Sequence, residues 1–205
     1  MIMDDKFQNK FRISSTRLQN WDYRWNGSYF VTICTNNREH YFGEIVDEKM
    51  QLSDIGEIAE SEWVKSPIIR PDMNLELGAF VVMPNHFHGI IIIGKNKYNR
   101  CVDGGGNGGV GGNDGGRDAM HCVSTDTDTD TNAKTKNQFG PQRKNLASII
   151  RGFKSKVTIQ AHEIQTDFAW QPLYNDHIIC NNQSFDRIQN YINTNIKNWK
   201  TDKFY

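Results

Sequence analysis

The chain has 205 residues, a length that favours one domain with appendages over two full domains. Hydrophobic residues make up 37% and charged residues 23%, as in a soluble globular protein. The 24 basic and 24 acidic residues balance, so the net charge excludes neither nucleic acids nor acidic ligands as partners. The longest apolar stretch, residues 75–93, contains Glu76, Pro84 and two histidines, which excludes a membrane-spanning helix and a membrane partner.

The N-terminus and the cysteines indicate the cellular compartment. The first three residues lead directly into Asp4, Asp5 and Lys6, so no signal peptide is predicted. The cysteines form no CxxC pair of the kind that binds metals or carries out redox chemistry. We therefore expect a cytoplasmic protein whose four cysteines are free thiols; these are Cys34, Cys101, Cys122 and Cys180.

One segment, residues 101–137, differs from the rest in composition. It contains DGGGNGGVGGNDGG and STDTDTDTN, with few large apolar residues and no hydrophobic periodicity. Such a segment buries too little apolar surface to offset the loss of chain entropy, so a disordered insertion in a surface loop is predicted. Its six acidic and three basic residues leave 21 basic and 18 acidic residues elsewhere, a net charge of +3.

The remaining sequence predicts a mixture of strands and helices. Runs of β-branched and aromatic residues indicate strands, and apolar residues at three- and four-residue spacing behind a capping Ser or Asn indicate helices. In chain order these are a strand at residues 29–35, a small hairpin at 42–46 and 50–52, a helix from Ser53 to about Lys65, strands at 76–83 and 86–93, a helix from Asn145 to about Gln165, a strand centred on 177–179, and a terminal helix from Ser184.

The order of these elements predicts the fold. Without the hairpin it is β-α-β-β-α-β followed by a helix, and this is the split β-α-β order of ferredoxin-like domains. We therefore expect an α+β, ferredoxin-like fold with an antiparallel sheet, two helices on one face, an additional C-terminal helix and the insertion. The other face of the sheet is left for a site or for the last helix. Residues 1–205 are expected to form a single domain, with residues 1–27 as an N-terminal extension.

Two histidines separated by one residue lie in the strand at residues 86–93. Successive side chains of a strand alternate between its faces, so His86 and His88 point the same way, about 7 Å apart along the strand. Phe87 then points into the opposite, packed layer. Two such imidazoles can bind one divalent metal ion if a third group comes from elsewhere. They can equally be hydrogen-bonded or surface histidines.

The terminal helix offers the third group. Tyr191 and Asn195 are four residues apart and therefore lie on the same helix face. The amide oxygen of Asn195 can ligate a hard cation such as Mg²⁺ or Mn²⁺, and the phenol of Tyr191 can act as a nucleophile. In the alternative interpretation, Tyr191 belongs to the core and Asn195 is one of several solvated asparagines.

The segment MPNHFH, residues 83–88, resembles the HUH motif (histidine, hydrophobe, histidine) of single-strand DNA transposases and relaxase-type nucleases. More narrowly, the chain resembles the REP-associated tyrosine transposases and their IS200-like HUH relatives. The resemblance rests on four stretches in the family's order, which cover most of the chain outside the insertion. These are residues 29–39, 80–93, 146–155, and 170–179 together with 187–199.

This resemblance implies a metal-dependent single-stranded DNA transposase or endonuclease, which cleaves and rejoins hairpin-associated DNA through a 5′-phosphotyrosine intermediate. It places the catalytic nucleophile at Tyr191, and it places His86, His88 and Asn195 around Mg²⁺ or Mn²⁺. Relatives often have Pro after the equivalent asparagine, whereas Ile196 stands here, a departure that leaves the ligands intact. Tyr174 is the competing nucleophile. The implied partner is single-stranded or hairpin DNA, and the protein is expected to be a monomer or a homodimer.

Two further stretches are candidates for DNA contact. The segment 142–156 carries five basic residues and no acidic one, which is typical of a surface that contacts phosphates, although a solvated helix face has the same pattern. In the WDYRW run, Arg24 and Trp25 can bind and stack on DNA or pack within the protein, and the resemblance favours DNA. The basic residues are Arg143, Lys144, Arg151, Lys154 and Lys156.

Two other functions remain open. Ferredoxin-like sheets also bind single-stranded DNA or RNA without catalysis, so the protein could be a non-catalytic binding module. A metal hydrolase that activates water would cleave DNA without a tyrosine. We expect His177 to be a buried, hydrogen-bonded structural residue of its strand.

Overall fold

The computed structural model describes residues 6–7, 10–11, 21–99 and 143–205. The insertion at 101–137 and most of the N-terminal extension lie outside these residues, so the predictions made for them stay predictions. Among the described residues, no helix has both the length and the apolar character needed to cross a membrane.

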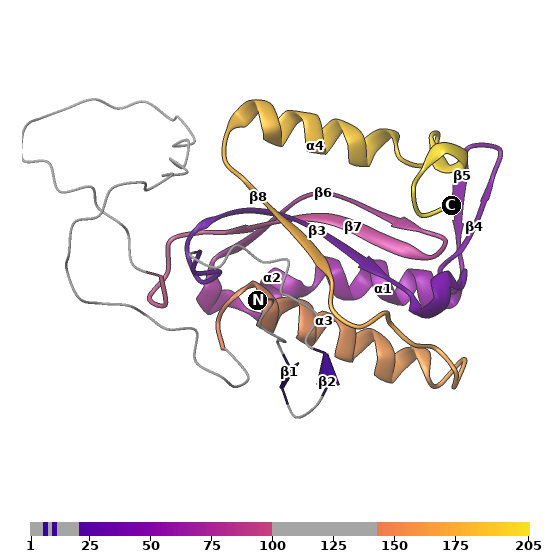
Figure 1. The fold of residues 1–205 in the computed structure, drawn as a ribbon, viewed down its shortest axis with the longest axis horizontal. Helices are drawn as coiled ribbons and strands as arrows, with labels where there is room; N and C mark the ends of the chain where they lie inside the picture. Colours follow the sequence, from indigo (N-terminus) through magenta and orange to yellow (C-terminus); the bar gives the residue numbers. More distant parts are fainter. Residues whose placement is uncertain (1–5, 8–9, 12–20, 100–142) are drawn as a thin grey trace, which may run out of the picture.

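A four-stranded antiparallel sheet forms the centre of the molecule (Figure 1). Its order is β6-β7-β3-β8, which places β8 at one edge and the two hairpin-connected strands at the other side. This order confirms the ferredoxin-like class. The strands are β3 (Gly27–Cys34), β6 (Leu75–Met83), β7 (His86–Ile93) and β8 (Asn175–Ile179).

Two long helices cover one face of this sheet. Helix α1 (Asp54–Val64) begins behind Ser53, whose side chain accepts a hydrogen bond from the Gly56 amide. Helix α3 (Leu146–Ala161) begins with a reciprocal capping box between Asn145 and Ser148, as the sequence predicts. Their apolar stripes pack on Tyr29, Val31 and Phe87 to form the main core, which contributes the hydrophobic stabilisation of the domain.

Helix α4 (Asn182–Thr194) lies on the opposite face (Figure 1). Its Ile188 and Ile192 pack on Ile90 and Ile179 in a second, smaller apolar cluster. The prediction that Ser184 caps this helix is wrong. The cap is Asn181, whose side chain accepts a hydrogen bond from the Ser184 amide, so the helix begins earlier than expected.

Short elements complete the described chain. The predicted hairpin is present as β4 (Gly43–Val46) and β5 (Lys49–Leu52), paired antiparallel outside the main sheet. A short helical turn, η3, follows α4 and leads into the C-terminal residues. The others are β1 (Lys6–Phe7), β2 (Lys10–Phe11), η1 (Asn36–Arg38), α2 (Ser66–Ile69), η2 (Pro71–Met73) and η3 (Trp199–Thr201).

The cysteines differ from the expectation. Cys34 is a free, buried thiol at the end of β3, as predicted. Cys180 is disulfide-bonded, so the expectation that all four thiols are free is wrong for this residue.

Gly89 is the point at which β7 lies closest to the helices beneath the sheet. A Cβ atom at this position would lie 2.5 Å from Cζ2 of Trp63, whose ring is fully buried. We expect Gly89→Ala to lower the free energy of unfolding by about 1–3 kcal/mol, because the tightly packed indole must move. Urea denaturation of the purified protein measures this change.

Gly152→Ala in α3 is the matched control. The atoms nearest its added Cβ belong to the far end of the Arg70 side chain, which can move aside at the loss of its hydrogen bond to the Ser148 carbonyl oxygen, and alanine favours the helix. An equal loss of stability in both variants would contradict the tight packing at Gly89.

Candidate functional site

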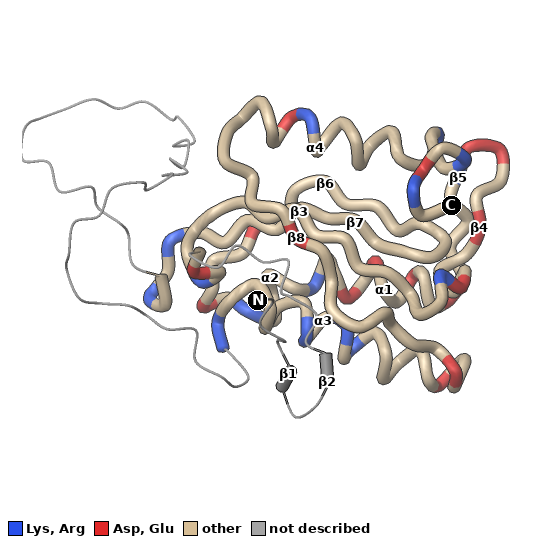
Figure 2. The backbone as a smooth tube through the Cα atoms, in the orientation of Figure 1, with Lys and Arg blue, Asp and Glu red and all other residues tan. Residues whose placement is uncertain are grey.

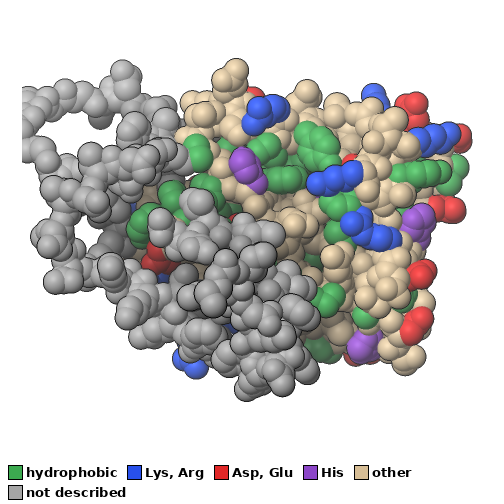
Figure 3. Space-filling model, in the orientation of Figure 1, with side chains coloured by type: hydrophobic (Ala, Val, Ile, Leu, Met, Phe, Trp, Pro, Cys, Tyr) green, Lys and Arg blue, Asp and Glu red, His purple; other side chains and the backbone are tan. Residues whose placement is uncertain are grey.

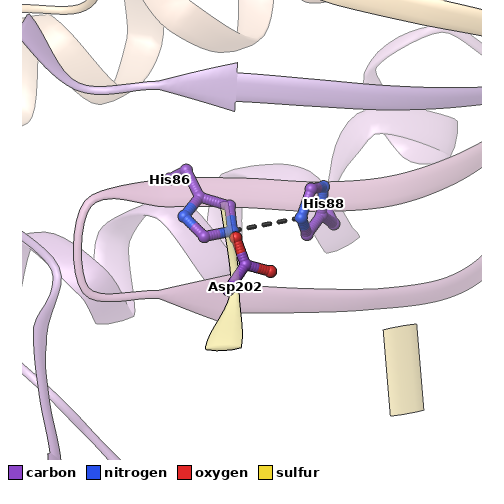
Figure 4. A group of neighbouring side chains, drawn as sticks. All are labelled: His86, His88 and Asp202. Carbon is purple, nitrogen blue, oxygen red and sulfur yellow. Dashed lines mark hydrogen bonds between the residues drawn. The ribbon is translucent and has the colours of Figure 1, made fainter. Parts of the chain in front are cut away.

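The alternation of β7 places both imidazoles on the face that α4 covers. His86 and His88 point toward each other, with their Nε2 atoms 3.0 Å apart (Figure 4). Phe87, between them, points into the main core and is fully buried. His86 is 0% and His88 1% exposed, so the pair is held within the protein rather than on its surface.

Each imidazole is oriented by a neighbour at its other nitrogen. Asn85 donates its amide N–H to the Phe204 carbonyl oxygen at 2.8 Å, which leaves its Oδ1 facing Nδ1 of His86, also at 2.8 Å. His86 therefore carries its proton on Nδ1 and presents a lone pair at Nε2. Nδ1 of His88 lies 2.9 Å from the Thr32 hydroxyl on the adjacent strand β3. Such partners fix the orientation of histidines that bind metals.

Both histidines are held in the neutral form. Burial lowers the pKa of His86 to about 2, and the positive charges of Arg38 and Lys203 act in the same direction. Burial also lowers the pKa of His88 to about 4, although the Asp202 carboxylate opposes this shift. At neutral pH the two rings therefore carry no charge and have lone pairs available for a cation.

Tyr191 lies directly against this pair. Its hydroxyl is 3.2 Å from Nε2 of His88 and donates a hydrogen bond to Oδ2 of Asp202 at 3.2 Å. Its side chain is 39% exposed, so it borders both the buried pair and the solvent. Burial and the Asp202 charge raise the pKa of Tyr191 to about 12. The structure thus brings the predicted tyrosine and the predicted histidines together.

Asp202 is the residue of this site that the sequence did not reveal. One carboxylate oxygen and one nitrogen from each of His86 and His88 all lie within 4.8 Å of one another (Figure 4). Asp202 follows η3, beyond the end of α4, so no helical spacing relates it to Tyr191. A lone acidic residue near a C-terminus carries no signal of this kind in the sequence.

Asn195, the predicted third ligand, borders the same carboxylate. It is 1% exposed and donates a hydrogen bond from Nδ2 to Oδ2 of Asp202 at 3.1 Å. Its Oδ1 is buried and accepts no hydrogen bond, which is unusual for a buried amide oxygen. The structure therefore places Asn195 beside the site and leaves an acceptor atom available there.

These donors fit a divalent metal ion. Two neutral imidazole nitrogens and a carboxylate oxygen converge, and the unpartnered amide oxygen of Asn195 lies beside them. Nitrogen and oxygen donors of this kind suit Mn²⁺, Zn²⁺ and other first-row ions, and the oxygen donors also suit Mg²⁺.

Aromatic side chains from the C-terminal residues pack against the histidines. The Phe204 ring lies 4.7 Å from the His86 ring and 5.8 Å from the His88 ring, measured between centroids. Trp199 contacts His86 at 5.9 Å, and the Arg38 guanidinium lies over Phe204. This covering accounts for the burial that keeps both imidazoles neutral.

The predicted basic residues of segment 142–156 lie on the other side of the sheet. They belong to α3 and to the turn before it (Figure 2), whereas His88 contacts Tyr191 of α4. Lys144 forms an ion pair with Asp72, and Lys154 donates hydrogen bonds to the carbonyl oxygens of Gln171 and Leu173. Arg143, Arg151 and Lys156 are exposed. Their role in DNA contact stays a prediction, separate from the histidine site.

The WDYRW run, residues 21–25, packs within the protein. Arg24 is bidentate to Asp22, and the Trp25 ring meets Trp21 edge to face at 5.0 Å. Trp21 donates a hydrogen bond to the Tyr29 hydroxyl. These contacts hold the segment against β3, and DNA contact by Arg24 and Trp25 stays a prediction.

Tyr174 and His177 lie on opposite sides of the sheet. Tyr174 packs against the main core beneath the sheet, away from the histidine pair. His177 is exposed in β8, so the expectation that it is buried is wrong. The reason is that β8 is an edge strand, and His177 faces away from the helices of the main core.

A comparison with known proteins identifies a relative. The chain is 32% identical over 192 residues to a Haemophilus influenzae protein named only as uncharacterized, covering 93% of this chain and 92% of the relative. The chain belongs to the family of this protein. No family model matches the sequence.

The family's fold is shared with a transposase of known structure. The solved structure of a REP-associated tyrosine transposase bound to a REP hairpin matches with a TM-score of 0.52 and 18% identity. The match covers 92% of this chain and 74% of that protein. At this identity the likeness shows a transposase-like fold, and the chemistry of the family must be argued from the site itself.

Asn85 is the residue that orients His86, and its removal tests this role. We expect Asn85→Ala to lower the free energy of unfolding by about 1–3 kcal/mol, because the Phe204 carbonyl and Nδ1 of His86 are left buried without partners. Asn193→Ala, an exposed position of α4, is the control and should change stability by less than about 0.5 kcal/mol. Equal stabilities of the two variants in urea denaturation would contradict the proposed orientation.

Proposed function

We propose that this protein is a metal-dependent transposase or endonuclease that cleaves and rejoins single-stranded, hairpin-associated DNA through a 5′-phosphotyrosine at Tyr191. The observation that carries this proposal is the position of the Tyr191 hydroxyl, 3.2 Å from His88, which itself faces His86 at 3.0 Å. A transposase-like fold supports it, and the REP-associated transposase with that fold was solved with a REP hairpin.

The phenol of Tyr191 is the attacking group. Its oxygen forms a bond to the scissile phosphorus while the bond from phosphorus to the 3′ oxygen breaks, and the released oxygen takes a proton from water to become a 3′-hydroxyl. With a pKa of about 12, only about one phenol in 10⁵ is ionised at pH 7, so deprotonation needs help. Asp202 accepts the hydrogen bond of the Tyr191 hydroxyl and is therefore positioned to take its proton.

The metal ion would be held by His86, His88 and the carboxylate of Asp202, with Oδ1 of Asn195 as a further ligand. When bound, it supplies a positive charge that polarises the scissile phosphate and offsets the charge developing in the transition state. Asn85 and Thr32 hold the two imidazoles in the orientation that this binding requires.

The groups of the proposed site lie in one chain. Tyr191, both histidines and Asp202 approach one another within a single copy. We therefore propose that a monomer is competent for the cleavage step.

An adduct assay tests the nucleophile. Purified protein incubated with hairpin-bearing single-stranded DNA and Mn²⁺ should form a covalent complex that survives denaturing electrophoresis. Tyr191→Phe should abolish this complex, because the attacking oxygen is removed. Tyr174→Phe is the matched control and should retain it, since Tyr174 packs against the core on the other side of the sheet.

Three results would reject this assignment. An adduct that persists in Tyr191→Phe and disappears in Tyr174→Phe would move the nucleophile to the competing tyrosine. Cleavage without any adduct would indicate a metal hydrolase that uses water, and binding without cleavage would indicate a non-catalytic binding module.

Metal binding is tested by calorimetric titration with Mn²⁺. Loss of a residue that only orients a metal ligand typically weakens metal binding roughly 10- to 100-fold. His86→Ala and Asp202→Ala remove proposed ligands, so each should weaken Mn²⁺ binding by more than this. His162→Ala, which removes an exposed histidine on the α3 side, should leave the affinity unchanged. Full Mn²⁺ affinity in His86→Ala would contradict the proposed metal site, and comparison of Asp202→Ala with Asn195→Ala ranks the two oxygen donors.

A further inference from the structure

The site is accessible from one direction. His86, His88 and Asn195 are each 1% exposed or less, whereas the Tyr191 side chain is 39% exposed. The C-terminal rings of Phe204 and Trp199 pack against His86. A polymer that places a phosphate at Tyr191 must therefore continue along the surface beside this tyrosine.

The sheet surface beside Tyr191 is formed by β3 and the edge strand β8. Thr32 pairs with His88 on one side and Asn175 on the other, and Phe30 pairs in the same way with Ile90 and His177. Residues directly opposite in paired strands share a face, so His177 and Asn175 lie on the same face as the histidine pair.

Among the described residues, nothing packs over Asn175 and His177 in this part of the face. Helix α4 packs mainly over β6, with further contacts to β7, and Asn175 and His177 on β8 are exposed. Figure 3 shows hydrophobic side chains gathered in a band beneath α4 on this side of the molecule. The sheet beside the tyrosine therefore offers an open surface rather than a closed cavity.

Phe30 links this surface to the reacting groups. Its ring stacks on the His88 ring at 5.3 Å with an angle of 28° between planes, and it meets the Tyr191 ring edge to face at 6.2 Å. Phe30 is partly exposed, and its cross-strand neighbour His177 is exposed on the same face at the sheet edge. Aromatic side chains therefore stand on this face both at the proposed site and on β8.

We infer that Phe30 and His177 form a stacking platform for the bases next to the phosphate attacked by Tyr191, with Asn175 placed to bond a base edge. This inference rests on the proposed function. The occupant is a single strand, because a base can lie flat on such rings only when it is not stacked and paired in a duplex.

Strand β8 contributes no acidic side chain to the platform face. The acidic neighbour on β8, Asp176, pairs with Val31 and so belongs to the opposite face. Arg38 and Lys203 lie close enough to the histidine pair for their positive charge to act on His86. A phosphate chain that leaves Tyr191 along β8 therefore meets no acidic residue of that strand on this face, and the carboxylate beside the tyrosine is that of Asp202.

Equilibrium binding tests the platform independently of cleavage. A short fluorescein-labelled oligothymidine is titrated with the full chain in EDTA, which prevents metal-dependent cleavage, and anisotropy gives the dissociation constant. His177→Ala should raise this constant roughly 5- to 150-fold, the effect of losing one aromatic stacking contact. His177→Tyr should bind like the original protein because a flat ring is retained, and His162→Ala on the opposite side should have no effect.

Crosslinking locates the strand. The same oligothymidine carrying 5-iodouracil should, on irradiation, crosslink to peptides that contain Phe30 or His177. Unchanged binding by His177→Ala, or crosslinks confined to α3, would overturn the platform. A tyrosine adduct combined with unchanged binding by His177→Ala would reject the platform and leave the proposed function intact. Binding that depends on His177 without any adduct would support the platform and reject the proposed chemistry.

Discussion

The contact on which the site depends is the approach of two neutral imidazoles inside the protein. Strand alternation aims His86 and His88 the same way, but alternation alone leaves the rings free to rotate into solvent. Here Asn85 and Thr32 hold the Nδ1 atoms, and Phe204 and Trp199 cover the rings, so both Nε2 atoms converge on one point. Burial then keeps the rings uncharged, which a cation-binding pair requires.

The two faces of the sheet pack against different elements. One face carries the large apolar core beneath α1 and α3, where Trp63, Phe87 and Phe153 pack closely. The other face carries a small cluster of isoleucines that holds α4 in place and thereby fixes the position of Tyr191 over β7. Because α4 leaves Asn175 and His177 of β8 exposed, the same packing that positions the tyrosine also leaves room for a polymer beside it.

Residues after α4 add further groups to the site formed by the two histidines and Tyr191. The chain turns back through η3, so that Asp202 meets Tyr191, Asn195 and the imidazoles. The Phe204 carbonyl fixes the Asn85 amide, and Asn85 in turn fixes His86. A short terminal segment thus contributes a carboxylate, a ring and a backbone acceptor to one place, and the shared carboxylate couples the proposed nucleophile to the proposed metal site.

The sequence by itself determined what depends on local periodicity and capping. Alternation placed His86 and His88 on one face, helical spacing placed Tyr191 with Asn195, and the element order gave the ferredoxin-like class. Only the tertiary structure decided which distant groups meet. It brought Thr32 and Asp202 to the imidazoles, moved the cap of α4 to Asn181, and exposed His177 at a sheet edge. The physical reason is that hydrogen bonds and strand pairing within a segment follow from its own residues, whereas burial, edge position and chain reversal depend on how separate segments pack.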